Sequence, residues 1–249
     1  ININIPVANE GGRGIKSEGN MFINGGLITI ESNSNGSVYF DTLGVKDSYT
    51  SSCIKTDANL TILGGTLNLS ATGSAGKCIN VDSVLTVGEL NADNELINIS
   101  ATTTGDQFLV SGSSSGGWGG PGQNSGDYAN PKAIKAGQNI YINSGHIVAS
   151  TQHEGGEGLE SKDTLFIRGG IIEAVTYDDA LNASHHIKIS GGKVYAKATH
   201  NDAIDANGSL SISGGLIVAE GATAPETSFD CDNNTFAITG GTLIGLGGN

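Results

Sequence analysis

The sequence predicts an all-β protein: a right-handed parallel β-helix (β-solenoid) of about eight coils with two loop insertions. Three observations predict this fold: abundant glycine, short runs of β-branched residues between turn residues, and a unit that repeats along the chain. Glycine supplies 39 of the 249 residues and proline only four, so the chain is neither collagen-like nor a proline-rich linker. No stretch has the apolar spacing of an amphipathic helix, and we expect essentially no helix.

The repeated unit is defined by apolar residues at fixed distances from a reference residue. In the unit that starts at Ile204, Leu210 follows six residues later, Ile212 eight residues later, and Gly214-Gly215 ten residues later. The same pattern recurs in units that start at Ile15, Ile54, Ile134, Leu159 and Leu181, with altered copies from Ile79 and Phe229. No unit of about 22 to 25 residues can bury its apolar face alone, so successive units are expected to stack as parallel strands.

Two other repeat folds fit this unit less well. A leucine-rich repeat has a similar length but requires a leucine-rich strand and an asparagine in the turn, whereas these units place Gly-Gly between two strands. A propeller blade needs a longer unit. The Gly-Gly pairs are expected at sharp corners, where positive φ and the absence of a Cβ favour glycine. We therefore predict one domain over residues 1–249, with insertions at about 32–52 and 101–131.

The charge and hydropathy of the chain limit its partners. The formal net charge of −13 argues against nucleic acid, since phosphate binding requires positive charge, and it favours divalent cations. Uncharged apolar runs are far shorter than the ~20 residues of a membrane span. We expect a soluble monomer, secreted or at the cell surface, and the start at Ile1 without an apolar leader is consistent with a mature or trimmed chain.

Stacking would place equivalent residues in columns along one edge of the molecule. The column just after the reference residue contains Lys16, Lys55, Asn80, Lys135, Glu160, Asn182, Asp205 and Asp230. The column three residues earlier contains Arg13, Ser52, Lys77, Lys132, Glu157, Asp179, Asp202 and Thr227. Basic residues therefore occupy the N-terminal half of this edge and carboxylates the C-terminal half.

The stacked carboxylates predict a calcium site. Two carboxylates ~5 Å apart repel by about 3 kcal/mol at an effective dielectric near 20, and a divalent cation with oxygen ligands would offset this. We expect calcium to be bound by Asp178, Asp179, Asp202 and Asp205, with Asn182, Asn201 and Asp230 as further ligands. The alternative is that these side chains extend into water at the rim of a turn, where Asp and Asn often cap the backbone.

The acidic motifs carry a resemblance to a known family. The stretches "DDALN", "NDAIDANG" and "FDCD", the last ahead of "GGT", resemble the bacterial β-helix family of cellulose- and acid-sugar-binding proteins, relatives of pectate lyases. The resemblance covers residues 116–249 well and residues 12–87 through weaker copies. It implies a secreted, surface-attached protein that binds cellulose or an acidic glycan and carries calcium on one flank.

Pectate lyases offer an enzymatic alternative. In that family, calcium bridges a uronate to protein carboxylates while Lys or Arg removes a proton, so the resemblance implies roles for the predicted calcium ligands and for a base among Lys132 and Lys135. Lys135 lies three units from Asp205, ~14 Å by strand spacing, whereas a base must come within about 3 Å of its proton. We therefore expect binding without catalysis, and leave a pectate-type lyase acting by β-elimination and a surface adhesin as alternatives.

Other residues complete the expected ligand site. Trp118 and Tyr128 lie in the glycine-rich insertion and can stack on sugar rings, and Lys135 and Glu160 are further ligand-binding candidates. The alternative for a loop aromatic is that it covers an apolar seam. The histidines are expected to face solvent rather than bind zinc, which needs converging ligands. Cys53 and Cys78 occupy equivalent positions, which permits a disulfide or two free thiols.

Overall fold

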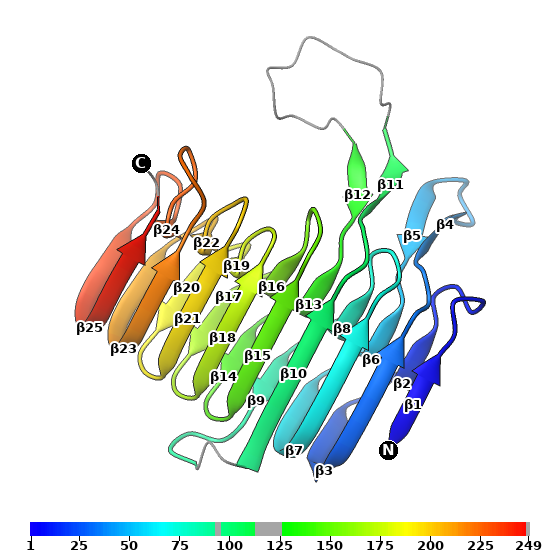
Figure 1. Cartoon of the computed structure of the whole chain (residues 1–249), viewed down its shortest axis with the longest axis horizontal. Coiled ribbons are helices and arrows are strands. Elements are labelled where there is room, and N and C mark those ends of the chain that lie inside the picture. The colour runs from blue at the N-terminus through cyan, green and yellow to red at the C-terminus, as the bar shows by residue number, and fades with distance from the viewer. Residues whose placement is uncertain (93–95, 113–125, 248–249) are drawn as a thin grey trace.

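The computed structural model describes residues 1–92, 96–112 and 126–247. These residues form β-strands and turns without an α-helix, as the sequence predicts (Figure 1). Two large parallel sheets make up the body of the molecule, and two antiparallel hairpins extend from it. The described residues contain no helix that is long and apolar enough to cross a membrane.

The strands fall into four sheets. The first sheet has thirteen strands: β1 (Asn2–Ile5), β3 (Met21–Ser32), β7 (Leu60–Ala71), β9 (Leu85–Val87), β10 (Ile97–Thr103), β14 (Ile140–Ile142), β15 (His146–Thr151), β17 (Thr164–Ile167), β18 (Ile171–Thr176), β20 (His186–Ile189), β21 (Lys193–Ala198), β23 (Leu210–Glu220) and β25 (Phe236–Leu246). The second has eight: β2 (Arg13–Ser17), β6 (Ser52–Thr56), β8 (Lys77–Val81), β13 (Lys132–Ala136), β16 (Glu157–Ser161), β19 (Leu181–Ala183), β22 (Ile204–Ala206) and β24 (Phe229–Asp230). The hairpins are β4 (Ser37–Phe40) with β5 (Lys46–Tyr49), and β11 (Phe108–Ser111) with β12 (Asp127–Ala129).

The strand pairing corrects the predicted fold class. Strand β7 runs unbroken through its Gly-Gly and pairs with both β9 and β10, and β23 likewise pairs with both β20 and β21. Ten parallel strands therefore close into one barrel-like sheet, in the order β7-β10-β15-β18-β21-β23-β20-β17-β14-β9 and back to β7. The right-handed parallel β-helix solenoid predicted from the sequence is wrong in this respect: the structure has a closed parallel sheet and a separate parallel sheet.

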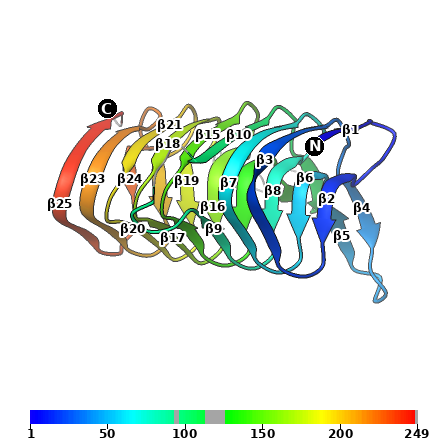
Figure 2. The same ribbon diagram turned by 90° about the horizontal axis from the view of Figure 1, so that it is seen from below.

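The predicted register between repeated units is confirmed within these sheets. The reference residues pair directly with one another through the second sheet, in the order Ile15, Ile54, Ile79, Ile134, Leu159, Leu181, Ile204 and Phe229. Those from Ile54 to Ile204 are fully buried in one continuous core. Each repeated unit forms one winding of the chain around the core. Figure 2 shows the successive windings side by side along the long axis. The two columns on the polar edge are therefore real spatial neighbours.

Glycine at the corners has two separate causes. Gly192 and Gly215 have φ values of +85° and +94°, in the region that L-residues with a side chain rarely adopt. In addition, a Cβ on Gly192 would lie 2.9 Å from the carbonyl oxygens of Gly169 and Gly170 in the preceding winding. The second glycine of the pair is thus required both by its own backbone and by the adjacent winding.

The predicted insertions form the two hairpins in part. Residues 32–52 contain β4 and β5, and residues 101–131 contain β11 and β12, which rise from the body of the molecule in Figure 1. Trp118 lies outside the described residues. Cys53 and Cys78 are buried free thiols, so the disulfide alternative does not apply.

Candidate functional site

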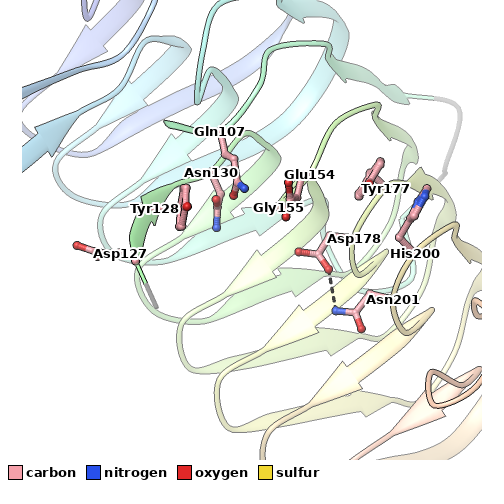
Figure 3. A pocket seen from close by; sticks show the side chains of 11 residues that line it. Gln107, Asp127, Tyr128, Asn130, Glu154, Gly155, Tyr177, Asp178, His200 and Asn201 are labelled. Carbon is pink, nitrogen blue, oxygen red and sulfur yellow. Dashed lines mark hydrogen bonds between the residues drawn. The ribbon is translucent and has the colours of Figure 1, made fainter. Parts of the chain in front are cut away.

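A groove of about 630 Å³ lies along the turns that join the two parallel sheets (Figure 3). Its residues come from the segments before β11 and β12, from β12 itself, and from the turns before β13, β16, β19 and β22: Gln107, Gly126, Asp127, Tyr128, Asn130, Glu154, Gly155, Tyr177, Asp178, His200 and Asn201. The groove is therefore built from equivalent turns of adjacent windings, with the β11–β12 hairpin at one end.

Two aromatic rings of neighbouring turns stack in this groove. The ring centroids of Tyr177 and His200 are 3.8 Å apart and their planes differ by 6°. These residues directly precede the two acidic motifs, so the repeat itself places one ring over the other. His200 is exposed, as predicted, and its Nδ1 lies 2.9 Å from the Thr199 hydroxyl. This pair was not predicted from the sequence, because the two aligned columns do not include the position of Tyr177 and His200.

The turns that carry the groove are held by threonine and asparagine side chains. Thr176 donates its hydroxyl hydrogen to the Asp178 carbonyl at 2.6 Å. Asn201 Nδ2 donates a hydrogen bond to Asp178 Oδ1 in the adjacent winding at 2.7 Å (Figure 3). Such local bonds are typical of Thr, Asn and Asp in turns. They fix Asp178 and Asn201, both predicted as metal ligands, in the wall of the groove.

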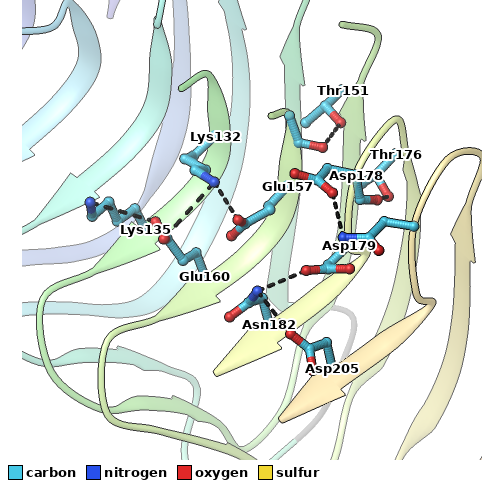
Figure 4. A network of polar contacts seen from close by, with 12 residues as sticks. Lys132, Lys135, Thr151, Glu157, Glu160, Thr176, Asp178, Asp179, Asn182 and Asp205 are labelled. Atoms are coloured by element: carbon cyan, nitrogen blue, oxygen red, sulfur yellow. Dashed lines mark hydrogen bonds and ion pairs between the residues drawn. The ribbon is translucent and has the colours of Figure 1, made fainter. Parts of the chain in front are cut away.

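A buried network of ion pairs lies at the point where the edge changes from basic to acidic (Figure 4). Lys132 Nζ is 2.5 Å from Glu157 Oε1 and 3.9 Å from Glu160 Oε1, while Lys135 Nζ is 3.6 Å from Glu160 Oε2. Lys162 also pairs with Glu160. Charge pairs of this kind make burial tolerable, since an isolated buried charge costs several kcal/mol.

These pairs determine the protonation of the network. Burial raises the pKa of Glu160, but Lys132, Lys135 and Lys162 outweigh it and lower the pKa to about 2. Burial lowers the pKa of Lys132, yet Glu157 and Glu160 outweigh it and the net shift is upward. A general base needs a pKa near the working pH, so the raised pKa of Lys132 does not favour that role.

Asp179 lies in the interior beyond this network. Only 3% of its surface is exposed, and its two oxygens accept hydrogen bonds from Asn182 Nδ2 at 2.8 Å and from the Asp202 backbone N–H at 3.1 Å. Burial, followed by the charges of Asp178 and Glu157, raises the pKa of Asp179 to about 9. The alternative that the acidic side chains extend into water therefore does not hold for Asp179.

Three predicted calcium ligands converge further along the edge. Asp202, Asp205 and Asp230 each offer a carboxylate oxygen within 4.8 Å of the others. Two ligands of one calcium ion, each 2.3–2.6 Å from it, can be separated by up to about 5 Å, so this spacing fits the ion. Burial raises the pKa of Asp205 to about 7, and the carboxylates of Asp202 and Asp230 add to this effect. The donor set and its electrostatics suit a hard divalent cation.

The predicted calcium ligands therefore do not all lie together in the structure. Asp178 and Asp179 bind amide groups of Asn201, Asn182 and Asp202, and they do not belong to the group of three carboxylates. Asn182 lies between the two parts: its Nδ2 also approaches Asp205 Oδ2 at 3.4 Å.

A second, smaller cavity of about 270 Å³ adjoins the groove and shares Tyr128 and Asn130 with it. The cavity is lined by the predicted ligand-binding residues Lys135 and Glu160. Tyr128, also predicted to bind the ligand, lines both the cavity and the groove. The cavity also contains Lys77, a residue of the predicted column for which no role was predicted. The alignment of repeated units shows that a lysine stands at this position, but it does not show that the side chain is buried. No sequence signal therefore distinguished Lys77 from the exposed lysines.

One comparison with known proteins matches the part of the chain that contains most of the groove residues. Residues 122–203 and 154–244 match the model of a family described as carbohydrate-binding domain-containing proteins. No curated protein matches the chain, and no solved structure matches it. The relationship to pectate lyases remains a prediction, and the family match supports carbohydrate binding by this chain.

Proposed function

We propose that this protein binds an acidic polysaccharide of plant type in the groove beside the β11–β12 hairpin. One observation carries the proposal: ten of the eleven residues that line the groove, all except Gln107, fall within the family match at 122–203. The groove combines aromatic rings with amide and carboxylate groups. Such a lining suits sugars, whose rings have apolar faces and polar edges.

The proposal includes calcium on the acidic edge. Asp202, Asp205 and Asp230 would bind the ion, and all three lie in the second matched segment, 154–244. When bound, calcium would supply positive charge that offsets the carboxylates and attracts an acidic sugar. Extracellular calcium modules operate at 10⁻⁴–10⁻³ M, which agrees with a proposed location outside the cell or at its surface.

Sugar binding is tested by calorimetry with oligogalacturonides and cello-oligosaccharides. Tyr177→Ala should weaken binding about tenfold, since stacking on an aromatic ring is worth ~1 kcal/mol or more. Asn201→Ala should also weaken it. Tyr39→Ala, on hairpin β4–β5 outside the groove, is the matched control and should bind as the wild type does.

Two outcomes would contradict the proposed function. One is that the wild-type protein does not bind oligogalacturonides, whether or not it binds cello-oligosaccharides. The other is catalysis: if incubation with polygalacturonate and calcium produces ultraviolet absorbance of unsaturated product, and chelation abolishes it, then the protein is a lyase rather than a binder.

The calcium site is tested separately by titrating the chelated protein with calcium. Asp205→Asn and Asp230→Asn should each lower the affinity, because each removes one anionic oxygen ligand from the group. Asp163→Asn is the matched control, since Asp163 is in another turn and outside the group. Equal affinities for all four proteins would exclude these ligands.

A further inference from the structure

The smaller cavity has an unusual balance of charge for this chain. Its lining contains four lysines and two glutamates: Lys77, Lys132, Lys135, Lys162, Glu157 and Glu160. When all six are ionised, the cavity has an excess of two positive charges, although the whole chain has a formal net charge of −13. A local positive site of this kind attracts an anion that the rest of the surface repels.

Among the four lysines that line the cavity, Lys77 is the one that forms no ion pair. Its Nζ donates to Thr50 Oγ1 at 3.0 Å and to the Ala75 carbonyl at 3.4 Å, both of which are neutral acceptors. Among the described residues, no carboxylate lies within ion-pair distance of it, and only 5% of Lys77 is exposed. Burying an ammonium group without a countercharge is costly, so Lys77 requires an explanation that core packing does not give.

The electrostatics of Lys77 favour a neighbouring negative charge. Burial lowers its pKa to about 7, and the positive charges of Lys135 and Lys132 act in the same direction. A bound anion would compensate for both effects. Lys132, Lys135 and Lys162, by contrast, each form an ion pair with a glutamate.

The location and size of the cavity limit the kind of anion that fits. Tyr128 and Asn130 line both the cavity and the large groove, so a group in the cavity can belong to a ligand that continues into the groove. The volume of about 270 Å³ is below the ~300–1,000 Å³ of sites for drug-sized ligands, which suits one sugar residue. Glu157 and Glu160 would repel a highly charged anion and thus favour a single negative charge.

We infer that Lys77 and Lys135 form a binding site for the carboxylate of one uronic acid residue, at the end of the groove beside the hairpin. This inference rests on the proposed function, because it assumes that the groove holds the rest of the glycan. It adds the residues that select an acidic sugar over a neutral one, by a direct contact separate from the calcium site.

The test compares oligogalacturonides with neutral galacto-oligosaccharides of the same length, by calorimetry in the presence of chelator. Lys77→Met should lower the ratio of acidic to neutral affinity about tenfold, the scale of one charge-assisted hydrogen bond. Lys135→Met, at a partly exposed side chain, should lower it in the same direction. Lys193→Met, an exposed lysine on β21 outside the cavity, should leave the ratio unchanged.

The outcomes separate this inference from the proposed function. If the wild type binds no glycan, the proposed function fails. If the wild type binds glycan but both cavity variants keep its preference for acidic sugars, the lysine site is wrong and the proposed function stands. The last measurement is competition by sulfate. If sulfate displaces the oligogalacturonide as well as galacturonate does, the cavity is a general anion site and the assignment to uronate is overturned.

Discussion

Replacing Lys77 by methionine should make the protein more stable. Methionine has a similar length but no charge, so it fits the site without a buried ammonium. The pKa of Lys77 in the folded protein is about 7, against an ordinary value of 10.5. At pH 6 the lysine is charged in both states, and the folded state bears the full cost of burying that charge.

The size of the effect follows from the shift in pKa. A difference of about 3.5 pKa units corresponds to about 5 kcal/mol at 1.36 kcal/mol per unit. The lost hydrogen bond to Thr50 offsets about 1 kcal/mol, which leaves a net stabilisation of about 4 kcal/mol at pH 6. Above pH 7 the folded protein releases this proton while the unfolded chain retains it, so the wild type gains stability and the difference falls by about 3 kcal/mol up to pH 9.

Urea unfolding of both proteins at pH 6, 7, 8 and 9 in chelator measures this difference. Lys193→Met provides the same chemical change at an exposed side chain and should follow the wild type at each pH. A Lys77→Met protein that is less stable than the wild type at pH 6, or whose advantage does not change with pH, would refute the reasoning.

Three further predictions concern the core, the acidic edge and a close backbone contact. Ile134→Ala should destabilise the protein by about 2–5 kcal/mol in urea unfolding, since Ile134 is fully buried in the core; a change below 1 kcal/mol would contradict its position. In chelator, the melting temperature should fall as the pH rises from about 4 to 7, because the pKa values of Asp179 and Asp205 are raised in the folded state and the stability present at low pH is lost as these groups ionise. Calcium should reduce this fall, and a melting temperature that does not change between about pH 4 and 7 would contradict the raised pKa values. Gly221→Ala should cost about 1–3 kcal/mol by thermal unfolding, because the new Cβ would collide with the Thr227 carbonyl oxygen, and wild-type stability would contradict that contact.

The register of the strands could be predicted from the sequence, but their closure could not. Buried residues such as Ile54 and Ile134 recur at fixed positions, and the burial of apolar side chains determines which residues pair. The Gly-Gly motif does not say whether a strand ends there or bends and continues. Strands β7 and β23 continue, which joins two faces into one closed sheet, and this depends on backbone hydrogen bonds that no side-chain pattern records.

The candidate site was predicted in part for similar reasons. The column of like charges correctly placed Asp205 beside Asp230, because that contact follows from the register. The hydrogen bonds that separate Asp179 from this group depend on side-chain conformations. The stacked Tyr177 and His200 were missed, although their spacing of 23 residues equals one repeat and could have revealed them.

The two hairpins emerge from turns without altering the register of the windings on either side. Ile79 pairs with Ile134 across 55 residues that include the β11–β12 hairpin, and Ile134 pairs with Leu159 across only 25. The scaffold therefore tolerates large changes of length at this edge. Exchanging one hairpin for another offers a route to new ligand specificities, in evolution or in engineering, while the buried framework stays the same.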